Sequence, residues 1–213
     1  MNRSTEARKI MMSETTNAAL KDVDQLPSKL AVMELLSKKF ELLPEAEKKF
    51  FTYGPLYLGF NGAFSGLIAN SLFRRVFSVA HGRYSSSLPM AVLPFLTTVA
   101  AYHGAISDPL LLGDLNCQSC AQIRAVLVGT VVGGLYPILL ALPMNIGLAA
   151  RYNTAPMPEK GKLLPFLANA TKPVLRKMTF VLGLQAFFGF YLGSRHYGIY
   201  LKMLKMPAVD SED

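Results

Sequence analysis

The stretch AVLVGTVVGGLYPILLALPMNIGLAA, residues 125–150, decides the fold of this chain, because none of its side chains is charged. A helix needs about 20 such residues to cross the roughly 30 Å hydrocarbon core of a bilayer. Three further stretches, 53–73, 84–107 and 178–194, also lack charged residues, although the last is short. The sequence therefore predicts an all-α, polytopic membrane protein whose four spans form a transmembrane helix bundle.

The composition of the 213-residue chain agrees with a membrane location. Hydrophobic residues make up 51% of the chain and charged residues 17%, and the mean hydropathy is +0.29. Charged residues form about 25% of an ordinary soluble domain. The formal net charge is +8, but the basic residues stand beside the spans without a groove of interleaved aromatics, which argues against nucleic-acid binding.

The segments outside the predicted membrane domain, residues 53–194, are short. Residues 1–26 are expected to form a flexible tail, residues 27–52 an amphipathic helical arm interrupted at Pro44, and residues 195–213 a C-terminal tail. The arm could lie on the membrane surface, contact a partner or pack on the protein's own loops. Its apolar residues recur every three or four positions: Leu30, Met33, Leu36, Phe40 and Leu43.

The charges between the spans predict the orientation. Loops 74–83 and 151–177 are rich in basic residues, whereas loop 108–124 carries two aspartates and only one arginine. By the positive-inside rule, the two basic loops face the inner compartment, and loop 108–124 faces outward together with both termini. The basic residues that mark the membrane boundary are Arg74, Arg75, Arg151, Arg176 and Lys177.

The cysteines, Cys117 and Cys120, form a CxxC pair in the outward loop. Such a pair can be a redox motif or half of a zinc site, but a zinc site needs further ligands, and the three histidines are elsewhere in the sequence. No thioredoxin-like strand pattern surrounds the pair. A local disulfide in an oxidising compartment, or two unreacted thiols, is the favoured interpretation.

The spans contain few groups that could perform chemistry. His103 lies near the end of a span, where contact with headgroups is favoured over a proton relay. The polar residues at depth suit hydrogen bonds between helices rather than catalysis; they are Asn61, Asn70, Asn145 and Gln185. The sequence contains no phosphate-binding loop, no HExxH motif and no plausible catalytic triad, so we expect neither an enzyme nor a bound metal or cofactor.

Small residues occur at helix-packing spacing in three of the spans. The pairs Gly62 and Gly66, Gly129 and Gly133, and Gly189 and Gly193 each form a GxxxG motif. Glycines at this spacing allow the backbone of a neighbouring helix to approach closely within lipid. The motifs favour a tightly packed bundle, although some of these faces could instead bind a partner's helices.

Several short motifs connect the chain with a known family. LPEAEKKFFTYG, GLIANSLFRR, LPMAVLPFLTT, CQSC, GGLYP, GLAARY, KPVLRKM and YLGS occur in this order. Over residues 43–194 the chain resembles the transmembrane protein 126 family of animal mitochondrial proteins. The CxxC pair and the LPEAE segment are closer to the A paralogue than to the B paralogue.

This resemblance implies a four-span protein of the mitochondrial inner membrane that acts as a noncatalytic assembly factor for respiratory complex I. Its partners would be membrane-arm subunits, other assembly factors and inner-membrane lipid, cardiolipin among them. The inner side would then be the matrix, and the CxxC pair would face the oxidising intermembrane space. The family contributes no active-site residues.

A second hypothesis is an inner-membrane channel or a preprotein translocase subunit. That function would require a hydrophilic groove, meaning polar residues along one face of a helix. The candidates for such a stripe are Asn61, Ser65 and Asn70 on the first span. A membrane enzyme that uses His103 or the CxxC pair is the third hypothesis.

Overall fold

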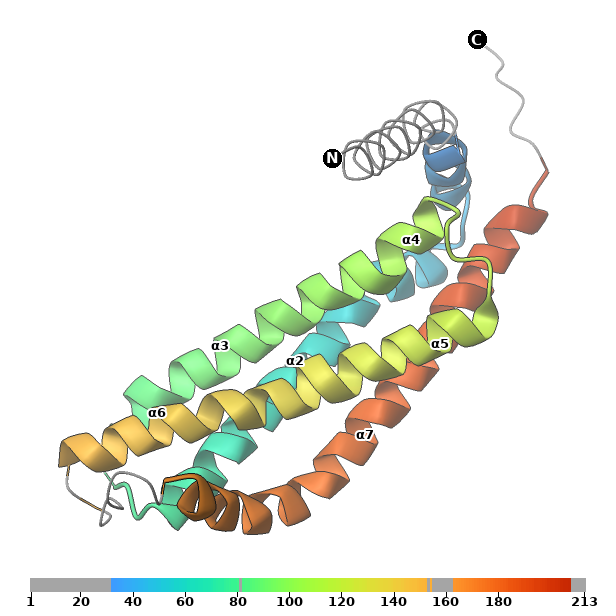
Figure 1. Ribbon diagram of the computed structural model, residues 1–213. Coiled ribbons are helices and arrows are strands. Elements are labelled where there is room, and N and C mark those ends of the chain that lie inside the picture. Colours follow the sequence, from blue (N-terminus) through green and yellow to red (C-terminus); the bar gives the residue numbers. More distant parts are fainter. Residues whose placement is uncertain (1–31, 81, 153, 155–162, 208–213) are drawn as a thin grey trace, which may run out of the picture.

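A computed structural model describes residues 32–80, 82–152, 154 and 163–207, and all regular secondary structure in these residues is helical. The all-α prediction is therefore confirmed for this part of the chain (Figure 1). The helices are 32–41, α2 (Glu45–Val76), α3 (Arg83–Tyr102), η1 (His103–Ser107), α4 (Asp108–Leu111), α5 (Gln118–Leu127), η2 (Val128–Leu135), α6 (Tyr136–Tyr152) and α7 (Leu163–Lys205), where η marks a π-helix.

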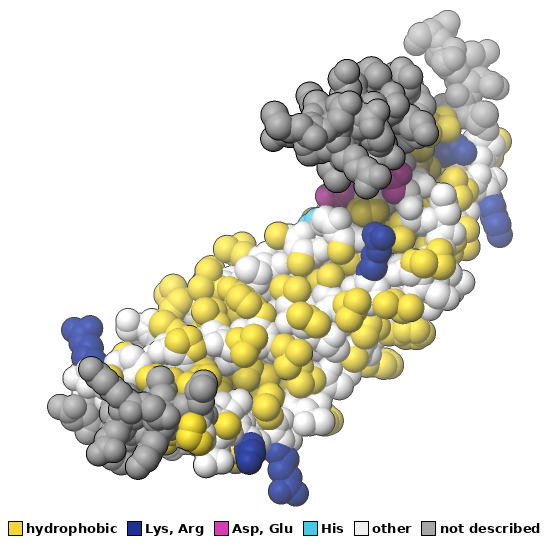
Figure 2. All heavy atoms as spheres, in the orientation of Figure 1, with side chains coloured by type: hydrophobic (Ala, Val, Ile, Leu, Met, Phe, Trp, Pro, Cys, Tyr) yellow, Lys and Arg dark blue, Asp and Glu magenta, His cyan; other side chains and the backbone are white. Residues whose placement is uncertain are grey.

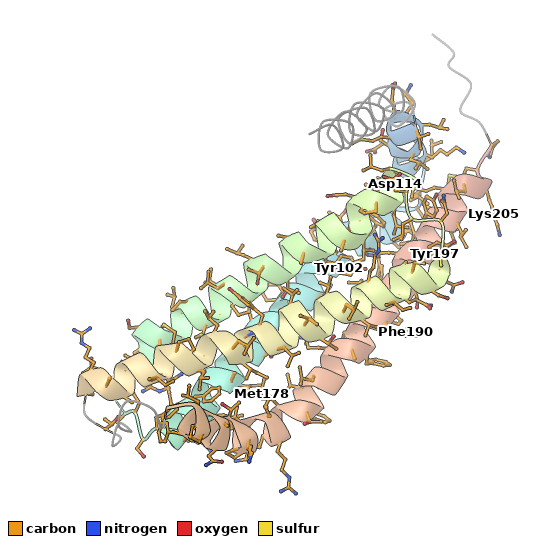
Figure 3. All side chains as sticks on the ribbon, in the orientation of Figure 1. Tyr102, Asp114, Met178, Phe190, Tyr197 and Lys205 are labelled. Atoms are coloured by element: carbon orange, nitrogen blue, oxygen red, sulfur yellow. The ribbon has the colours of Figure 1, made fainter. Side chains whose placement is uncertain are left out.

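The short elements join into long rods that run lengthwise beside α2 and α7 (Figure 1). The segment Tyr84–Leu111 is one continuous helix of 28 residues, and Gln118–Tyr152 is another of 35 residues. Helix α2 packs most extensively against α3, and α5 packs against α7. Asp114 and Lys205 lie at the same end of the molecule (Figure 3), so the loop between α4 and α5 and the end of α7 share that end.

Two helices are long and apolar enough to cross a membrane by length and composition, namely Tyr84–Leu111 and Gln118–Tyr152. They contain the predicted spans 84–107 and 125–150. The predicted spans 53–73 and 178–194 lie within α2 and α7, whose glycine, tyrosine and polar residues lower the hydropathy. Whether α2 and α7 also cross a membrane stays a prediction.

The helix ends differ from the limits of the uncharged stretches. Helix α2 starts directly after Pro44 and continues through the predicted arm–span boundary at residue 53. Helix α7 has 43 residues and extends beyond the predicted span 178–194 at both ends. The reason is that charged side chains on an exposed helix surface stop a hydropathy run without stopping the backbone hydrogen bonds.

The helix 32–41 packs on the protein itself. Leu36 and Leu43 are buried in a cluster with residues of α2 and α7, and the Lys39 Nζ donates to the Met206 carbonyl at 3.0 Å. Of the alternatives left open by the sequence, packing on the protein's own chain is the one that these residues adopt. Residues 1–31, which include the predicted tail and the start of the arm, lie outside the described residues.

The buried apolar residues form two clusters, one toward each end of the helices. The first includes Phe51, Leu58 and Tyr102, and the second includes Phe73, Met90 and Met178. Between them, buried polar side chains occupy the middle of the long helices: Ser65, Thr98 and Gln185. The two apolar clusters are therefore separated by buried polar side chains near mid-length.

Candidate functional site

The most extensive candidate site is the apolar outer surface of the helices. Hydrophobic side chains cover the middle of the face in Figure 2, whereas most Lys and Arg side chains stand near its ends. Tyr57 is 72% exposed, Leu139 68% and Phe180 73%. Soluble monomers rarely expose apolar area on this scale, so the surface suits lipid or the helices of another membrane protein.

The six glycines of the GxxxG motifs lie where two helices meet. A Cβ atom on Gly66 would stand 2.0 Å from the Met90 carbonyl oxygen of α3, and one on Gly62 would stand 2.8 Å from the Thr98 Oγ1. Gly129 and Gly133 face Gln185 of α7. In turn Gly189 and Gly193 face α5, with the Ala125 oxygen 2.5 Å from a Cβ on Gly189.

Prolines release backbone carbonyl groups, some of which accept hydrogen bonds from neighbouring helices. A proline has no N–H, so the carbonyl four residues earlier loses its helical partner and must find another one. Pro137 releases the Gly133 carbonyl in this way, and the Gln185 Nε2 donates to that oxygen at 3.1 Å. Pro109 releases the Ala105 carbonyl, and the Arg124 guanidinium donates to it at 3.4 Å.

The same reasoning explains the close approach of α3 to Gly66. Pro94 lies inside α3 and releases the Met90 carbonyl, which is the oxygen that faces Gly66. Each π-helical stretch ends two residues before a proline, η1 before Pro109 and η2 before Pro137, consistent with a local widening where the helical hydrogen-bond pattern is interrupted. Glycines and prolines thus determine together where the helices touch.

A buried hydrogen-bond network joins α2, α3 and α6. The Asn145 Nδ2 donates to the Asn70 Oδ1 at 2.9 Å and to the Ala141 carbonyl at 2.8 Å. The Asn70 Nδ2 in turn donates to the hydroxyls of Ser86 and Ser87, both at 3.3 Å. The sequence predicted that Asn70 and Asn145 hydrogen-bond between helices, and the structure confirms it.

Gln185 also bonds between helices, as predicted, whereas Asn61 donates to the Tyr57 carbonyl of its own helix at 2.9 Å. Asn70 is 1% exposed and is committed to the interior. The stripe predicted along one face of the first span is therefore not continuous, because Asn70 lies in the core while Asn61 stands near the surface.

His196 is a buried residue that the sequence analysis placed in a tail. Its ring stacks on Phe51 with centroids 4.5 Å apart and meets the edges of Phe50 and Tyr102. The Tyr102 hydroxyl lies 3.2 Å from the His196 Nδ1. Figure 3 shows Tyr102 on α3 between the helices, so this contact ties α2, α3 and α7 together at one end of the molecule.

The signal that could have identified His196 is helical spacing. Leu192, Ile199 and Met203 are buried on the same face of α7, and His196 continues their spacing of three and four residues. His103, by contrast, lies in η1 and is half-buried. Among the described residues, no group of three or more His, Cys, Asp or Glu side chains could hold a metal ion.

Cys117 and Cys120 are both exposed at the start of α5, and their sulfurs are not joined in the structure. The Cys117 Sγ caps the helix by accepting a hydrogen bond from the Cys120 N–H at 3.3 Å. The pKa of the Cys117 thiol is below its ordinary value, mainly because the Cys120 side chain hydrogen-bonds to it and then because a backbone N–H does so. A lowered pKa favours the thiolate, which is the form that enters thiol–disulfide exchange.

The predicted Cys117–Cys120 disulfide can be tested by alkylation. We expect a thiol-reactive maleimide, added without reductant to membranes that contain the protein, to leave both cysteines unlabelled, and to label both after reduction. Mass spectrometry of the peptide that contains the pair gives the readout. In the control variant Cys120→Ser, Cys117 should be labelled under both conditions, and double labelling of the unreduced wild-type protein would contradict the prediction.

The predicted basic boundary residues have different surroundings. The Arg74 guanidinium donates to the Ser86 hydroxyl at 3.1 Å and to the Ala80 carbonyl at 2.9 Å. Arg75 is exposed and lines the same hollow of about 430 Å³ as Arg74, together with Ser71, Ser78 and Ser87. Arg151, Arg176 and Lys177 are exposed as well. Guanidinium and hydroxyl donors suit a phosphate group.

Comparisons with known proteins agree with the helical membrane architecture. The family model described as Transmembrane protein 126 matches residues 30–210. Transmembrane protein 126A of Mus musculus is 50% identical over 181 residues, which cover 85% of this chain and 92% of that protein. Transmembrane protein 126A of Homo sapiens is 48% identical over 177 residues, which cover 83% and 91%.

A more distant relative has a name that states a function. The protein named Complex I assembly factor TMEM126B, mitochondrial, of Homo sapiens is 33% identical over 174 residues, covering 82% of this chain and 75% of that protein. No solved structure matches the chain significantly.

Proposed function

The chain belongs to the transmembrane protein 126 family, and on that premise we propose that it is a noncatalytic assembly factor for the membrane arm of mitochondrial respiratory complex I. It holds newly made hydrophobic subunits in the inner membrane until they join their neighbours. The relative TMEM126B, which is named a complex I assembly factor, supports a role of this chain in complex I assembly. The observation that carries the mode of action is the exposed apolar surface of the helices.

The membrane arrangement that fits this function has all four long helices crossing the bilayer. At a rise of 1.5 Å per residue, a helix of 20 residues already spans about 30 Å, and α2 has 32 residues and α7 has 43. Loops 74–83 and 151–177 face the matrix in this arrangement. Loop 108–124 and both termini face the intermembrane space.

Lipid is the second class of partner. The hollow at Arg74 and Arg75 contains no acid among its lining residues and lies at the end of the molecule assigned to the matrix. Anionic headgroups, including those of cardiolipin, would be attracted there by about 1 kcal/mol per basic residue. Other complex I assembly factors are the remaining class of partner in this proposal.

The alternative of a channel or a preprotein translocase subunit lacks a supporting observation. This function needs a continuous polar path. However, Asn70 is hydrogen-bonded to Asn145 in the interior, and Asn61 is hydrogen-bonded to the backbone of its own helix. We therefore retain the assembly factor as the proposed function.

The proposal is tested by capturing the full chain during mitochondrial translation. We expect newly made membrane-arm subunits of complex I to be enriched with a C-terminally tagged protein after pulse-labelling and solubilisation in mild detergent. Cells that lack the protein should accumulate incomplete membrane-arm intermediates on native gels. Normal maturation of complex I in such cells, together with capture of imported precursors, would contradict the assembly function and favour the translocase.

A further inference from the structure

A groove runs between α2 and α7 on the outer surface of the molecule. Two hollows of about 300 and 200 Å³ share Asn61 as a common lining residue. Together they extend from Phe50 to Ile68 along α2 and from Phe180 to Leu192 along α7. We call this feature the α2–α7 groove. At a rise of 1.5 Å per residue, its length on α2 is about 27 Å, close to the thickness of the hydrocarbon core.

The walls of the groove are apolar and aromatic. Tyr57 is 72% exposed, Phe64 61% and Phe180 73%. Such rings offer a large contact area to another apolar surface. The walls of the groove therefore suit either a lipid chain or a protein helix.

The floor of the groove narrows the choice of occupant. Ser65 and Gln185 are 0% and 1% exposed, and both line the smaller hollow. Neither the Ser65 Oγ nor the Gln185 Oε1 has a hydrogen-bond partner among the described residues. The amide nitrogen of Gln185 is already bonded to the Gly133 carbonyl, so its oxygen is left as an acceptor without a donor.

These two atoms lie near the middle of the predicted spans 53–73 and 178–194, where an unsatisfied polar group is most costly. An acyl chain fills the groove but has no donor for either oxygen. A transmembrane helix with a hydroxyl or amide side chain at mid-depth satisfies both the aromatic walls and the polar floor.

We infer that the α2–α7 groove is the docking site for one transmembrane helix of the client subunit, and that this helix carries a side-chain hydrogen-bond donor that reaches Ser65 and Gln185. The inference rests on the proposed function, because it assigns a site to the client. Rotation of the exposed rings of Phe64 and Phe180 at the rim opens the floor to the entering side chain.

Photo-crosslinking in intact mitochondria tests the site. With benzoylphenylalanine in place of Phe64, irradiation after pulse-labelling of mitochondrial translation is expected to yield an adduct with a newly made complex I membrane-arm subunit. The matched position is Leu139, which is 68% exposed on α6 and does not line the groove. We expect little or no adduct with that subunit from Leu139.

The polar floor is tested by Ser65→Ala in the chain that carries the crosslinker at Phe64. The adduct should fall about fivefold, the effect of one hydrogen bond between helices in a membrane. The thermal midpoint of the purified protein should be unchanged or raised, because the substitution removes a buried hydroxyl that has no partner. Thr179→Val is the control, since this exposed hydroxyl bonds to the Leu175 carbonyl outside the groove, and it should leave the adduct unchanged.

The outcomes separate the site from the function. If the crosslinker at Leu139 but not at Phe64 formed an adduct with a newly made complex I subunit, the α2–α7 groove would not be the docking site. The proposed assembly function would be unaffected. If the crosslinker at Phe64 reacted only with lipid or only with a second copy of the chain, the groove would also not be the docking site of the client helix. A full-strength adduct in Ser65→Ala would overturn the polar contact, and the absence of complex I subunits at both positions would count against the assembly function itself.

Discussion

Gly66→Ala is expected to be the most damaging single substitution, with a loss of about 3 kcal/mol or more in the free energy of unfolding. The new Cβ would stand 2.0 Å from the Met90 carbonyl oxygen. This oxygen belongs to the backbone of α3, so it cannot rotate away as a side chain could. Helices α2 and α3, which form the most extensive helix contact in the molecule, would have to separate. The measurement is the thermal midpoint of the purified protein in mild detergent.

Gly183→Ala is the matched control. It also replaces a glycine inside a long helix, but apart from its chain neighbours and the adjacent backbone of its own helix, no described atom lies within 4 Å of the position of its Cβ. Because alanine favours the helix over glycine by up to about 1 kcal/mol, this variant should be as stable as the wild type or slightly more stable. Equal losses in Gly66→Ala and Gly183→Ala would show that the close approach to Met90 is not what limits stability.

His196→Ala is expected to have the second largest effect, a loss of about 3 kcal/mol. The substitution removes a ring that is in contact with three aromatic side chains from α2 and α3. It also leaves the hydroxyl of the buried Tyr102 without the partner at 3.2 Å, which adds the desolvation penalty of an unpaired group. The thermal midpoint of the purified protein and its steady-state level in cells are the readouts.

Two further variants identify the cause of the His196 effect. His196→Phe keeps a ring of similar shape and loses only the polar contact, so it should lose less stability than His196→Ala. His103→Ala, at a half-buried position in η1, should have a small effect. If His103→Ala and His196→Ala were equally destabilising, the aromatic cluster would have no special role.

The spans and the helix contacts could be predicted from sequence to different degrees. Hydropathy located the uncharged stretches, because the hydrocarbon core selects against charge. It did not give the length of α7, since exposed lysines and arginines end an apolar run without ending a helix. For the same reason His196 was assigned to a tail, although it follows the apolar spacing of its helix.

The contacts themselves needed three-dimensional information. Prolines at 94, 109 and 137 lack an N–H and so release carbonyl groups from the helical hydrogen-bond pattern, but the sequence does not say which residue approaches each carbonyl. Gly66, Arg124 and Gln185 are 24, 19 and 52 positions away from Met90, Ala105 and Gly133, respectively. These pairings depend on the rotation and tilt of whole helices, which side-chain packing decides.

The bond between Gln185 and the Gly133 carbonyl has a consequence for the biogenesis of the protein. In the proposed arrangement with four spans, the helix Gln118–Tyr152 would enter the bilayer before α7, and the carbonyl released by Pro137 would then face lipid without a donor. The three preceding long helices would therefore form an incomplete insertion intermediate until the C-terminal helix docks. A chain truncated before α7 would keep this defect permanently and present it to the proteases that monitor the membrane.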